Sequence, residues 1–308
     1  MGEFDLIARY FTRTTPRAAL GVGDDCALLQ PAPGMQLAIS SDMLVEGRHF
    51  FADVDPFSLG HKALAVNLSD LAACGAQPLA FTLALADAHG CELIGGDTTQ
   101  GPLNICITVF GELPRGQALL RSGARAGDDI YVSGTLGDAR LALEILRGRV
   151  AAPAAVLAAA RLRLEQPTPR VALGLALRGL ATAAIDVSDG LLGDLGHILK
   201  QSGVGATVET DIAIDLVAAN AWWTGVKGLF CPEITPGQWL GWALAGGDDY
   251  ELLFTAPVSS RAEVAAASSA SQTPVTRIGR IESERGLRLV DAQGRAVPNT
   301  FPSFNHFA

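Results

Sequence analysis

Carboxylates recur in this chain where apolar runs end, and Gly, Ser or Thr rather than Lys or Arg flank them. Like charges close together destabilise one another, so a fold that gathers these groups must supply cations or protons. Mg²⁺ prefers oxygen ligands and usually keeps phosphates as its other ligands. The pattern therefore indicates a site where metals bridge to a nucleotide or a phosphate ester. Its instances are Gly23-Asp24-Asp25, Ser40-Ser41-Asp42, Asn67-Leu68-Ser69-Asp70, Gly95-Gly96-Asp97-Thr98-Thr99, Asp186-Val187-Ser188-Asp189-Gly190 and Gly246-Gly247-Asp248-Asp249.

A single acidic motif of this kind says little, because Asp commonly caps helices and starts turns. The prediction depends on the repetition of such motifs along the chain. Each motif lies at a predicted strand or helix boundary, beside small residues that let a polyphosphate and its ions approach the backbone. Ser40, Ser41 and Ser188 add hydroxyl or carbonyl oxygens to the candidate ligands.

Composition limits the classes of partner. The chain has 308 residues, with 23 Lys plus Arg against 32 Asp plus Glu, so its formal net charge is −9. This length allows two domains. The charge argues against a nucleic-acid partner or an anionic membrane surface, and it would repel a phosphorylated substrate unless metals reversed the local field. The five Cys have no metal-site spacing, which is typical of thiols in a reducing cytoplasm. Neither a signal peptide nor a membrane-spanning helix is predicted.

The apolar runs predict a mixture of helices and strands, an α/β (α+β) chain, and the polar hinge from Arg125 to Asp129 places the boundary between two domains, 1–124 and 125–308. Pro56 to Gly75 is the clearest helix, because its apolar positions recur at three and four and Gly75 with Pro78 gives a stop signal. Asp186 ends a predicted strand, and Ser188-Asp189 occupies the N-cap of the next helix. Other helices are predicted at 6–11, 137–149, 171–180 and 191–201, with an Ala-rich helix to 164. Strands are predicted at 26–29, 35–40, 79–85, 103–110, 130–133, 182–187 and 250–255.

One connection is too short for its surroundings. Only Ala86 to Gly90 separate the strand that ends near Leu85 from the apolar run Cys91 to Ile94. A parallel crossover needs roughly a dozen residues or more. The two runs either pair as a hairpin or have lost an intervening helix, and we favour the second interpretation.

Established nucleotide motifs are missing. The sequence contains no G-x-x-x-x-G-K-[ST] P-loop and no G-x-G-x-x-G that opens a helix after a strand. Gly95 to Thr99 remains a candidate phosphate-approach loop, and Arg121 is a candidate contact to a terminal phosphate, with a solvated surface arginine as the alternative. His49 lies in a Gly-containing loop next to the acidic set, where a functional role and a structural one are both open.

These motifs, in this order, resemble the thiamine-monophosphate kinase family, within the aminoimidazole-ribotide-synthetase-like superfamily of ATP-dependent enzymes. The resemblance runs from Gly2-Glu3-Phe4 to Asn305-His306-Phe307. Its most specific segments are Gly21-Val22-Gly23-Asp24-Asp25-Cys26-Ala27, Ser41-Asp42-Met43-Leu44-Val45-Glu46-Gly47-Arg48-His49-Phe50, Lys62-Ala63-Leu64-Ala65-Val66-Asn67-Leu68-Ser69-Asp70-Leu71-Ala72, Gly95-Gly96-Asp97-Thr98-Thr99 and Asp186-Val187-Ser188-Asp189-Gly190-Leu191.

The resemblance implies transfer of the γ-phosphoryl group of ATP to thiamine monophosphate, giving thiamine diphosphate and ADP, by direct in-line transfer with several Mg²⁺ ions. The acceptor is already a phosphate, so no strong base is needed and no catalytic residue is named beyond the metal ligands. The resemblance also implies a cytoplasmic homodimer, with an N-terminal mixed sheet that forms a barrel across the dimer and an α/β C-terminal domain.

Roles are carried over residue by residue. The implied metal ligands are Asp25, Ser40, Ser41, Asp42, Asp70, Asp97, Asp186 and Asp189. The implied ATP contacts are Gly96, Asp97, Arg121 and Ser188. The implied contacts to thiamine phosphate are His49, Asp248 and Phe304, whose ring covers the thiamine.

Three features depart from the family pattern. The family has a longer segment, with a helix, where this chain has only Ala86 to Gly90, and it has Glu where this chain has Asp248. The Trp-rich stretch from Ala221 to Trp242 also fits the pattern poorly.

Three rival functions are considered. A selenophosphate synthetase would need a Cys and a Lys near a glycine-rich N-terminus, and a hydrogenase-maturation carbamoyl dehydratase would need a C-terminal Cys; the sequence has neither. A metal-dependent phosphatase of the same ester and a non-catalytic protein that binds divalent ions are the other two.

Overall fold

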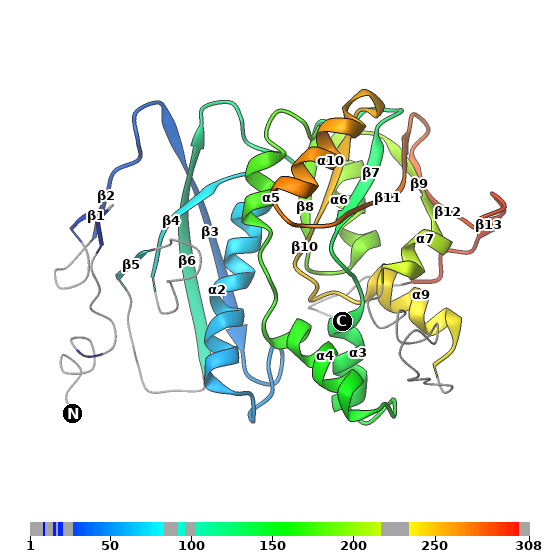
Figure 1. Ribbon diagram of the computed structural model, residues 1–308, viewed down its shortest axis with the longest axis horizontal. Coiled ribbons are helices and arrows are strands. Elements are labelled where there is room, and N and C mark those ends of the chain that lie inside the picture. The colour runs from blue at the N-terminus through cyan, green and yellow to red at the C-terminus, as the bar shows by residue number, and fades with distance from the viewer. Residues whose placement is uncertain are drawn as a thin grey trace.

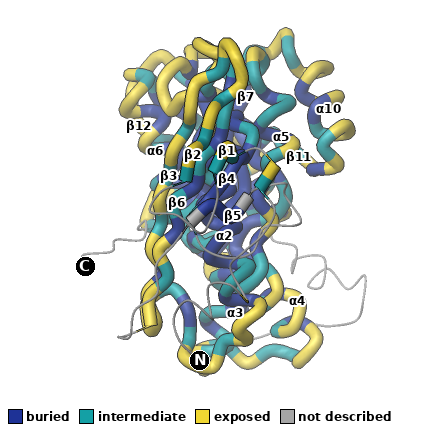
Figure 2. The backbone as a smooth tube through the Cα atoms, turned by 90° about the vertical axis from the view of Figure 1, so that its left-hand side faces the viewer, coloured by how far each residue is buried: buried dark blue, intermediate teal, exposed yellow. Residues whose placement is uncertain are grey.

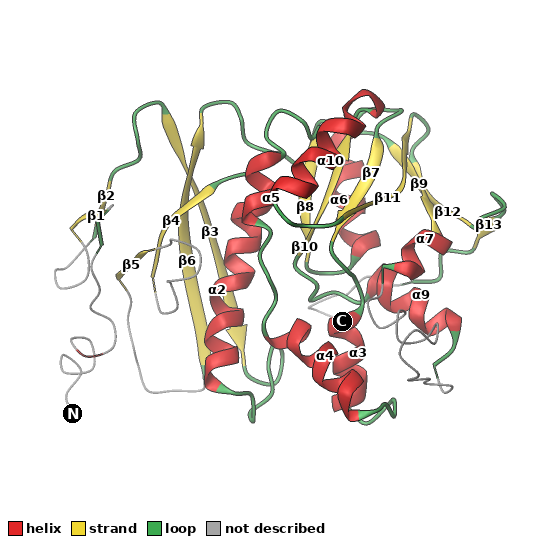
Figure 3. Cartoon of the chain, in the orientation of Figure 1, coloured by secondary structure: helices red, strands yellow, loops and turns green. Residues whose placement is uncertain are grey.

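The computed structural model describes residues 9, 15–16, 18–20, 27–82, 92–95, 103–216 and 234–301. Two mixed β-sheets lie in two halves of the molecule, with helix α2 (Pro56–Ala73) between them (Figures 1 and 3). This arrangement confirms the predicted mixed α/β fold of two domains. No helix in the described ranges is both long and apolar enough to span a membrane.

The N-terminal sheet has four strands in the order β3-β6-β4-β5. Strands β3 and β6 pair antiparallel over their whole length, whereas β4 and β5 pair parallel. This sheet stays open within the described residues, so the barrel across a dimer remains a prediction. The strands are β3 (Met35–Val45), β4 (Gln77–Thr82), β5 (Glu92–Gly95) and β6 (Asn104–Pro114), and a separate pair is formed by β1 (Ala18–Leu20) and β2 (Leu28–Leu29).

Helix α2 covers one face of this sheet and also contacts the second domain. It begins at Asp55, whose side chain accepts a hydrogen bond from the backbone N–H of Ser58 at 2.9 Å, with Pro56 in the first turn. Against the sheet it packs leucines such as Leu64 and Leu68. Its last turn lies so close to helix α5 that a side chain on Gly174 would meet the carbonyl oxygen of Ala72 at 2.1 Å. The helix is therefore the structural link between the domains.

The C-terminal sheet has seven strands in the order β13-β12-β9-β11-β7-β10-β8, all antiparallel except the pair β12 and β9. Alternation along β7 directs Ile130 and Val132 to the core with α6, and Tyr131 to the core with α5 and α10. Helices α3, α4 and α9 form a third apolar cluster. The elements are β7 (Asp129–Ser133), α3 (Asp138–Leu146), α4 (Ala154–Glu165), α5 (Val171–Ala176), β8 (Ala183–Val187), α6 (Leu191–Ser202), β9 (Gly205–Glu209), α7 (Thr210–Asp215), α9 (Pro236–Ala245), β10 (Glu251–Ala256), η2 (Val258–Ser260), α10 (Arg261–Ala270), β11 (Val275–Glu282), β12 (Gly286–Val290) and β13 (Ala296–Val297).

The structure corrects the prediction for the strand that precedes Asp42. The apolar pattern predicted an end near Ser40, but β3 continues to Val45, so Ser40 and Asp42 lie inside a strand. Pairing with β6 at every position outweighs the poor strand propensity of the Ser-Ser-Asp run. From Ala38 to Leu44 the even-numbered residues of β3 are less exposed than their neighbours, and Ala38 and Leu44 pack with residues of α2, while Leu37, Ile39 and Met43 are exposed. Figure 2 shows exposed and intermediate positions along this strand.

The structure also decides whether the two apolar runs on either side of 86–90 pair as a hairpin. Strands β4 and β5 are parallel, so the hairpin interpretation is wrong. The segment that joins them, and the predicted helix at 6–11 apart from Arg9, lie outside the described residues. The other predicted helices and strands of the described ranges are present, with ends that shift by a few residues.

Candidate functional site

A polar cavity of about 330 Å³ opens between the two domains. Its walls come from β3 and the loop after it, from α2, from α3, and from the two loops that adjoin β8 and β10. The acidic residues in the wall come from both domains and are Asp42, Asp70, Asp186, Asp189 and Asp248. Carboxylates far apart in the sequence thus meet in one place.

Two of these carboxylates accept hydrogen bonds from serine hydroxyl groups. Ser40 Oγ donates a hydrogen bond to Asp70, and Ser69 Oγ donates one to Asp186 at 2.9 Å. Burial raises the pKa of Asp70, although the hydrogen bond from Ser40 and the charge of Arg121 lower it. Burial, and then the charge of Asp70, raise the pKa of Asp186 to about 8. A cation placed beside these carboxyl groups would replace the protons that they otherwise retain.

The loop after β8 is held from within helix α6. Asp194 Oδ2 accepts hydrogen bonds from the backbone N–H groups of Ser188 and Asp189, at 3.1 and 3.2 Å. The N-cap is Gly190, with φ 107°, so the predicted capping role of Ser188-Asp189 is wrong. Because a helix residue satisfies the loop's donors instead, the Asp189 side chain lines the cavity. Burial, and then the charge of Asp189, raise the pKa of Asp194 to about 7.

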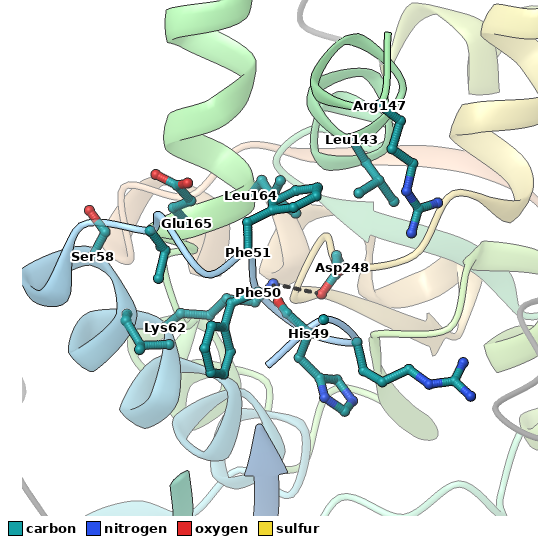
Figure 4. A pocket seen from close by; sticks show the side chains of 14 residues that line it. His49, Phe50, Phe51, Ser58, Lys62, Leu143, Arg147, Leu164, Glu165 and Asp248 are labelled. Atoms are coloured by element: carbon teal, nitrogen blue, oxygen red, sulfur yellow. Dashed lines mark hydrogen bonds and ion pairs between the residues drawn. The ribbon is translucent and has the colours of Figure 1, made fainter. Parts of the chain in front are cut away.

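A second group of residues surrounds Asp248. Lys62 Nζ lies 3.0 Å from Asp248 Oδ1 and donates to the carbonyl oxygen of His49 at 3.3 Å (Figure 4). The Tyr250 hydroxyl donates to the same Asp248 oxygen at 3.2 Å. Asp248 and Tyr250 both have positive φ, 61° and 51°, which is a strained conformation for non-glycine residues. Lys62, on α2, thus ties the His49 loop of one domain to the Asp248 loop of the other.

The strained loop has a rigid base. Glu251, at the start of β10, is fully buried and accepts hydrogen bonds from Arg163 at 2.7 Å and from Arg170 at 2.6 Å. Ser133 Oγ donates to it at 2.5 Å. Arg163 also donates to the carbonyl oxygen of Asp249 at 3.3 Å. This ion cluster holds the backbone next to Asp248 in place.

The cavity also has a basic wall that sequence reasoning missed. Arg48, Arg140 and Arg147 line it, in addition to the predicted Arg121. The interpretation that metals replace a basic cradle is therefore incomplete, because arginines and carboxylates face the same space. Arg140 and Arg147 lie outside every motif of the resemblance, and Arg48 lies inside the Ser41 to Phe50 segment without an implied role, so no pattern distinguished them from surface residues.

A small pocket of about 50 Å³ adjoins the cavity, and its wall is largely apolar. Phe51, Leu143 and Leu164 lie on one side of it, and Lys62 and Asp248 on the other (Figure 4). His49 lines both spaces, and its Nδ1 accepts a hydrogen bond from the backbone N–H of Val45 at 3.0 Å. The predicted pair His49 and Asp248 therefore lies where a polar space meets an apolar one.

The structure brings most of the predicted residues together, but not all. Arg121, Ser188, His49 and the five carboxylates line the cavity. The Ser41 hydroxyl points to the other face of β3, where it donates to the carbonyl oxygen of Ile107 at 3.1 Å. No three His, Cys, Asp or Glu side chains of the described ranges form a metal-binding cluster. Asp25, Gly96, Asp97 and Phe304 lie outside those ranges.

Family models match both domains. Residues 23–87 match the N-terminal domain, and residues 125–292 the C-terminal domain, of AIR synthase related protein. The fold and the cavity between its domains thus define an AIR synthase-related protein of two domains.

Individual relatives narrow the class further. The chain is 44% identical to the thiamine-monophosphate kinase of Salmonella typhimurium, covering 100% of this chain and 98% of the relative. A crystal structure of thiamine-monophosphate kinase from Stenotrophomonas maltophilia K279a is 43% identical with a TM-score of 0.79, covering 96% of this chain and 98% of that chain. AaThiL complexed with AMPPCP and TMP is 29% identical with a TM-score of 0.70, covering 99% and 97%. This chain belongs to the thiamine-monophosphate kinase family.

The Salmonella alignment spans 332 positions, 24 more than this chain has residues. The relative thus has residues that this chain lacks, in agreement with the interpretation that a segment has been lost.

Proposed function

We propose that this protein transfers the γ-phosphoryl group of ATP to thiamine monophosphate and so makes thiamine diphosphate and ADP. One observation supports this most strongly: carboxylates from both domains converge on one cavity, in a chain 44% identical to a thiamine-monophosphate kinase. The complex of the relative AaThiL with AMPPCP and TMP agrees with the two substrates.

The reaction needs positioning and charge neutralisation more than covalent chemistry. The polar cavity would hold the phosphates of both substrates, and the adjoining apolar pocket suits the rings of the acceptor. Arg121 and Ser188, with Gly96 and Asp97, are proposed to bind ATP. His49 and Asp248, with Phe304, are proposed to bind thiamine monophosphate. The acceptor phosphate is itself the nucleophile, so no general base is assigned.

Several Mg²⁺ ions are part of the proposal. Buried carboxylates whose pKa is raised, with hydroxyl oxygens beside them, are a donor set that suits a hard cation. Mg²⁺ would neutralise charge on the phosphates and orient them for in-line transfer. The proposed ligands are Asp25, Ser40, Asp42, Asp70, Asp97, Asp186 and Asp189, with Ser41 assigned through its backbone carbonyl oxygen, because its hydroxyl points to the other face of β3.

Product analysis tests the function. The protein is mixed with Mg²⁺, ATP and thiamine monophosphate, and the thiamine species are separated chromatographically. The kinase yields thiamine diphosphate, a phosphatase yields free thiamine, and a protein that only binds ions yields neither. Asp42→Asn keeps the side-chain volume and removes one carboxylate from the cavity, so turnover should be lost while the fold is retained. Turnover near wild type would exclude Asp42 from the mechanism.

We also propose that the protein is a cytoplasmic homodimer with domains at 1–124 and 125–308. The exposed face of β3 supports the dimer, since it presents Ile39, 61% exposed, beside Leu37, Met43 and Val45. Ile39→Lys should turn a dimer into a monomer in analytical ultracentrifugation. Leu162→Lys, at an exposed leucine on α4, is the matched control and should leave the mass unchanged.

A further inference from the structure

The polar cavity and the apolar pocket share part of their walls. Six residues line both spaces, namely Gly47, Arg48, His49, Leu143, Arg147 and Asp248. A ligand with rings at one end and a phosphate at the other would pass from the apolar space to the polar one along this shared wall. Its phosphate would then lie beside whatever cations the shared wall offers.

The cations of the shared wall are two arginines. Within the described part of the chain, neither the Arg48 nor the Arg147 guanidinium group forms a hydrogen bond or an ion pair. By contrast, Arg163 and Arg170 are both bound to Glu251. In a chain of net charge −9, two unpaired arginines beside one cavity are available to an anion from outside the chain.

The helix that presents Arg147 has a second donor on the same face. Arg140, Leu143 and Arg147 follow one another at intervals of three and four along α3 and its C-cap, and all three line the cavity. Figure 4 shows Leu143 and Arg147 on the side of this helix that faces Asp248. Arg140 Nε is buried and has no hydrogen-bond partner in the described structure. This helix face therefore presents the Arg147 guanidinium group and one unpartnered donor of Arg140, whose Nη2 is paired with Glu144 at 2.8 Å.

We propose that Arg48 and Arg147 bind the phosphate group of the acceptor and so select thiamine monophosphate over unphosphorylated thiamine. This inference rests on the proposed function. An arginine offers a planar pair of donors that matches two phosphate oxygens. The acceptor phosphate is favoured over ATP because Arg121 and Ser188 line only the polar cavity, whereas Arg48 and Arg147 also reach the apolar pocket.

The test compares two ligands in several variants. Binding of thiamine monophosphate and of thiamine is measured by calorimetry in the presence of Mg²⁺ and a non-hydrolysable ATP analogue. In wild type, the phosphate should increase affinity at least about 100-fold, because each of the two arginines adds about 10-fold, the usual size of a charge-assisted contact. Arg147→Gln or Arg48→Gln should each remove about 10-fold of this preference and leave thiamine binding unchanged. The KM for thiamine monophosphate should rise in proportion, with the KM for ATP within about twofold.

Arg295→Gln is the control. Its side chain is 74% exposed, it is paired with Asp291, and it lines neither space, so neither binding nor turnover should change. Arg147→Lys keeps the charge but loses the paired donors, so it should recover the preference only in part.

Two outcomes would overturn the inference. One is an unchanged ratio of the two affinities in the Arg48→Gln, Arg147→Gln double variant. The other is a rise in the KM for ATP alone, which would assign these arginines to the nucleotide. Failure of the proposed function is a separate result, because wild-type protein would then form no thiamine diphosphate at all.

Discussion

Removing the charge of Lys62 tests whether the two domains are joined at the site in the way the structure indicates. Lys62→Met keeps a long apolar side chain but deletes the ammonium group that binds Asp248 and the His49 carbonyl oxygen. Lys62 is 3% exposed, so water cannot take the place of that group. The Asp248 carboxylate would lose its only described cation partner inside the chain.

The size of the effect follows from burial. Removing one partner of a fully buried ion pair costs about 3–5 kcal/mol, whereas an exposed pair contributes about 0–1 kcal/mol. Asp248 is 34% exposed, so water can partly solvate it after its partner is lost. We therefore expect Lys62→Met to lower the free energy of unfolding by about 2 kcal/mol. The KM for thiamine monophosphate should rise as well, because the Asp248 loop loses its anchor on α2.

Urea unfolding, followed by fluorescence and circular dichroism, measures this loss wherever the two probes give coincident transitions. Lys200→Met, at an exposed lysine near the end of α6, is the control and should stay within about 0.5 kcal/mol of wild type. Adding Asp248→Asn to Lys62→Met removes the unpaired carboxylate charge. The double variant should therefore lose less free energy of unfolding than the sum of the losses in the two single variants. Strict additivity, or a Lys62→Met variant as stable as the control, would refute the reasoning.

Three further predictions concern other parts of the structure. Burial raises the pKa of Asp186 from its ordinary value of 3.8 to about 8, so between these two values the native state holds a proton that the unfolded state has released. The free energy of unfolding without metal should therefore fall as pH rises from about 4 to about 8. Asp186→Asn should remove up to about 4 kcal/mol of the loss between pH 5 and 8, measured by urea titration with chelator present. An unchanged pH dependence in this variant would contradict the prediction. Glu251→Gln leaves two arginines without a carboxylate and should lower the free energy of unfolding by about 3–5 kcal/mol. The control, Glu284→Gln at an exposed ion pair, should lower it by less than about 0.5 kcal/mol. Equal effects would show that the Glu251 cluster does not stabilise the fold. Gly174→Ala places a methyl group 2.1 Å from the Ala72 carbonyl oxygen and should lower the free energy of unfolding by about 1–3 kcal/mol. Gly196→Ala, in open space on α6, is the control and should raise it by about 0.5–1 kcal/mol. Equal melting temperatures of the two variants would argue against the close approach of α5 to α2.

Local patterns predicted the elements and the acidic wall. The α2 helix is visible in the sequence because its apolar period and its stop signal are both local. The acidic motifs could be grouped because each has the same surroundings of small residues. What the pattern could not give is the direction of a side chain, as Ser41 illustrates. Its hydroxyl points away from the cavity because β3 continues past the predicted end, and that continuation depends on pairing with β6, more than sixty residues later.

The basic residues of the site could not be predicted for a related reason. Lys62 lies among apolar residues of a helix, and its partner is 186 residues away in the chain. Arg48 and Arg147 come from different domains. Arg147 has no motif around it, and Arg48 lies in the Ser41 to Phe50 segment, where the resemblance implies no role for it. A charged residue whose role depends on a distant partner has the same local signature as one that extends into solvent.

The acidic and the basic residues of the cavity wall have complementary roles toward the phosphates of the two substrates. Two phosphorylated substrates must approach although both are anions, and repulsion between them opposes transfer. Buried carboxylates alone would add to that repulsion, and their raised pKa values reflect the cost of keeping them there. Arginines alone would hold the phosphates without fixing the geometry of metals between them. A cavity with carboxylates on one wall and arginines on the other can hold metal ions against the first and an acceptor phosphate against the second. The strained turn at Asp248 and the protonated Asp186 are stability costs located at this cavity, and the buried Glu251 cluster beside it holds the backbone in the conformation that the cavity requires.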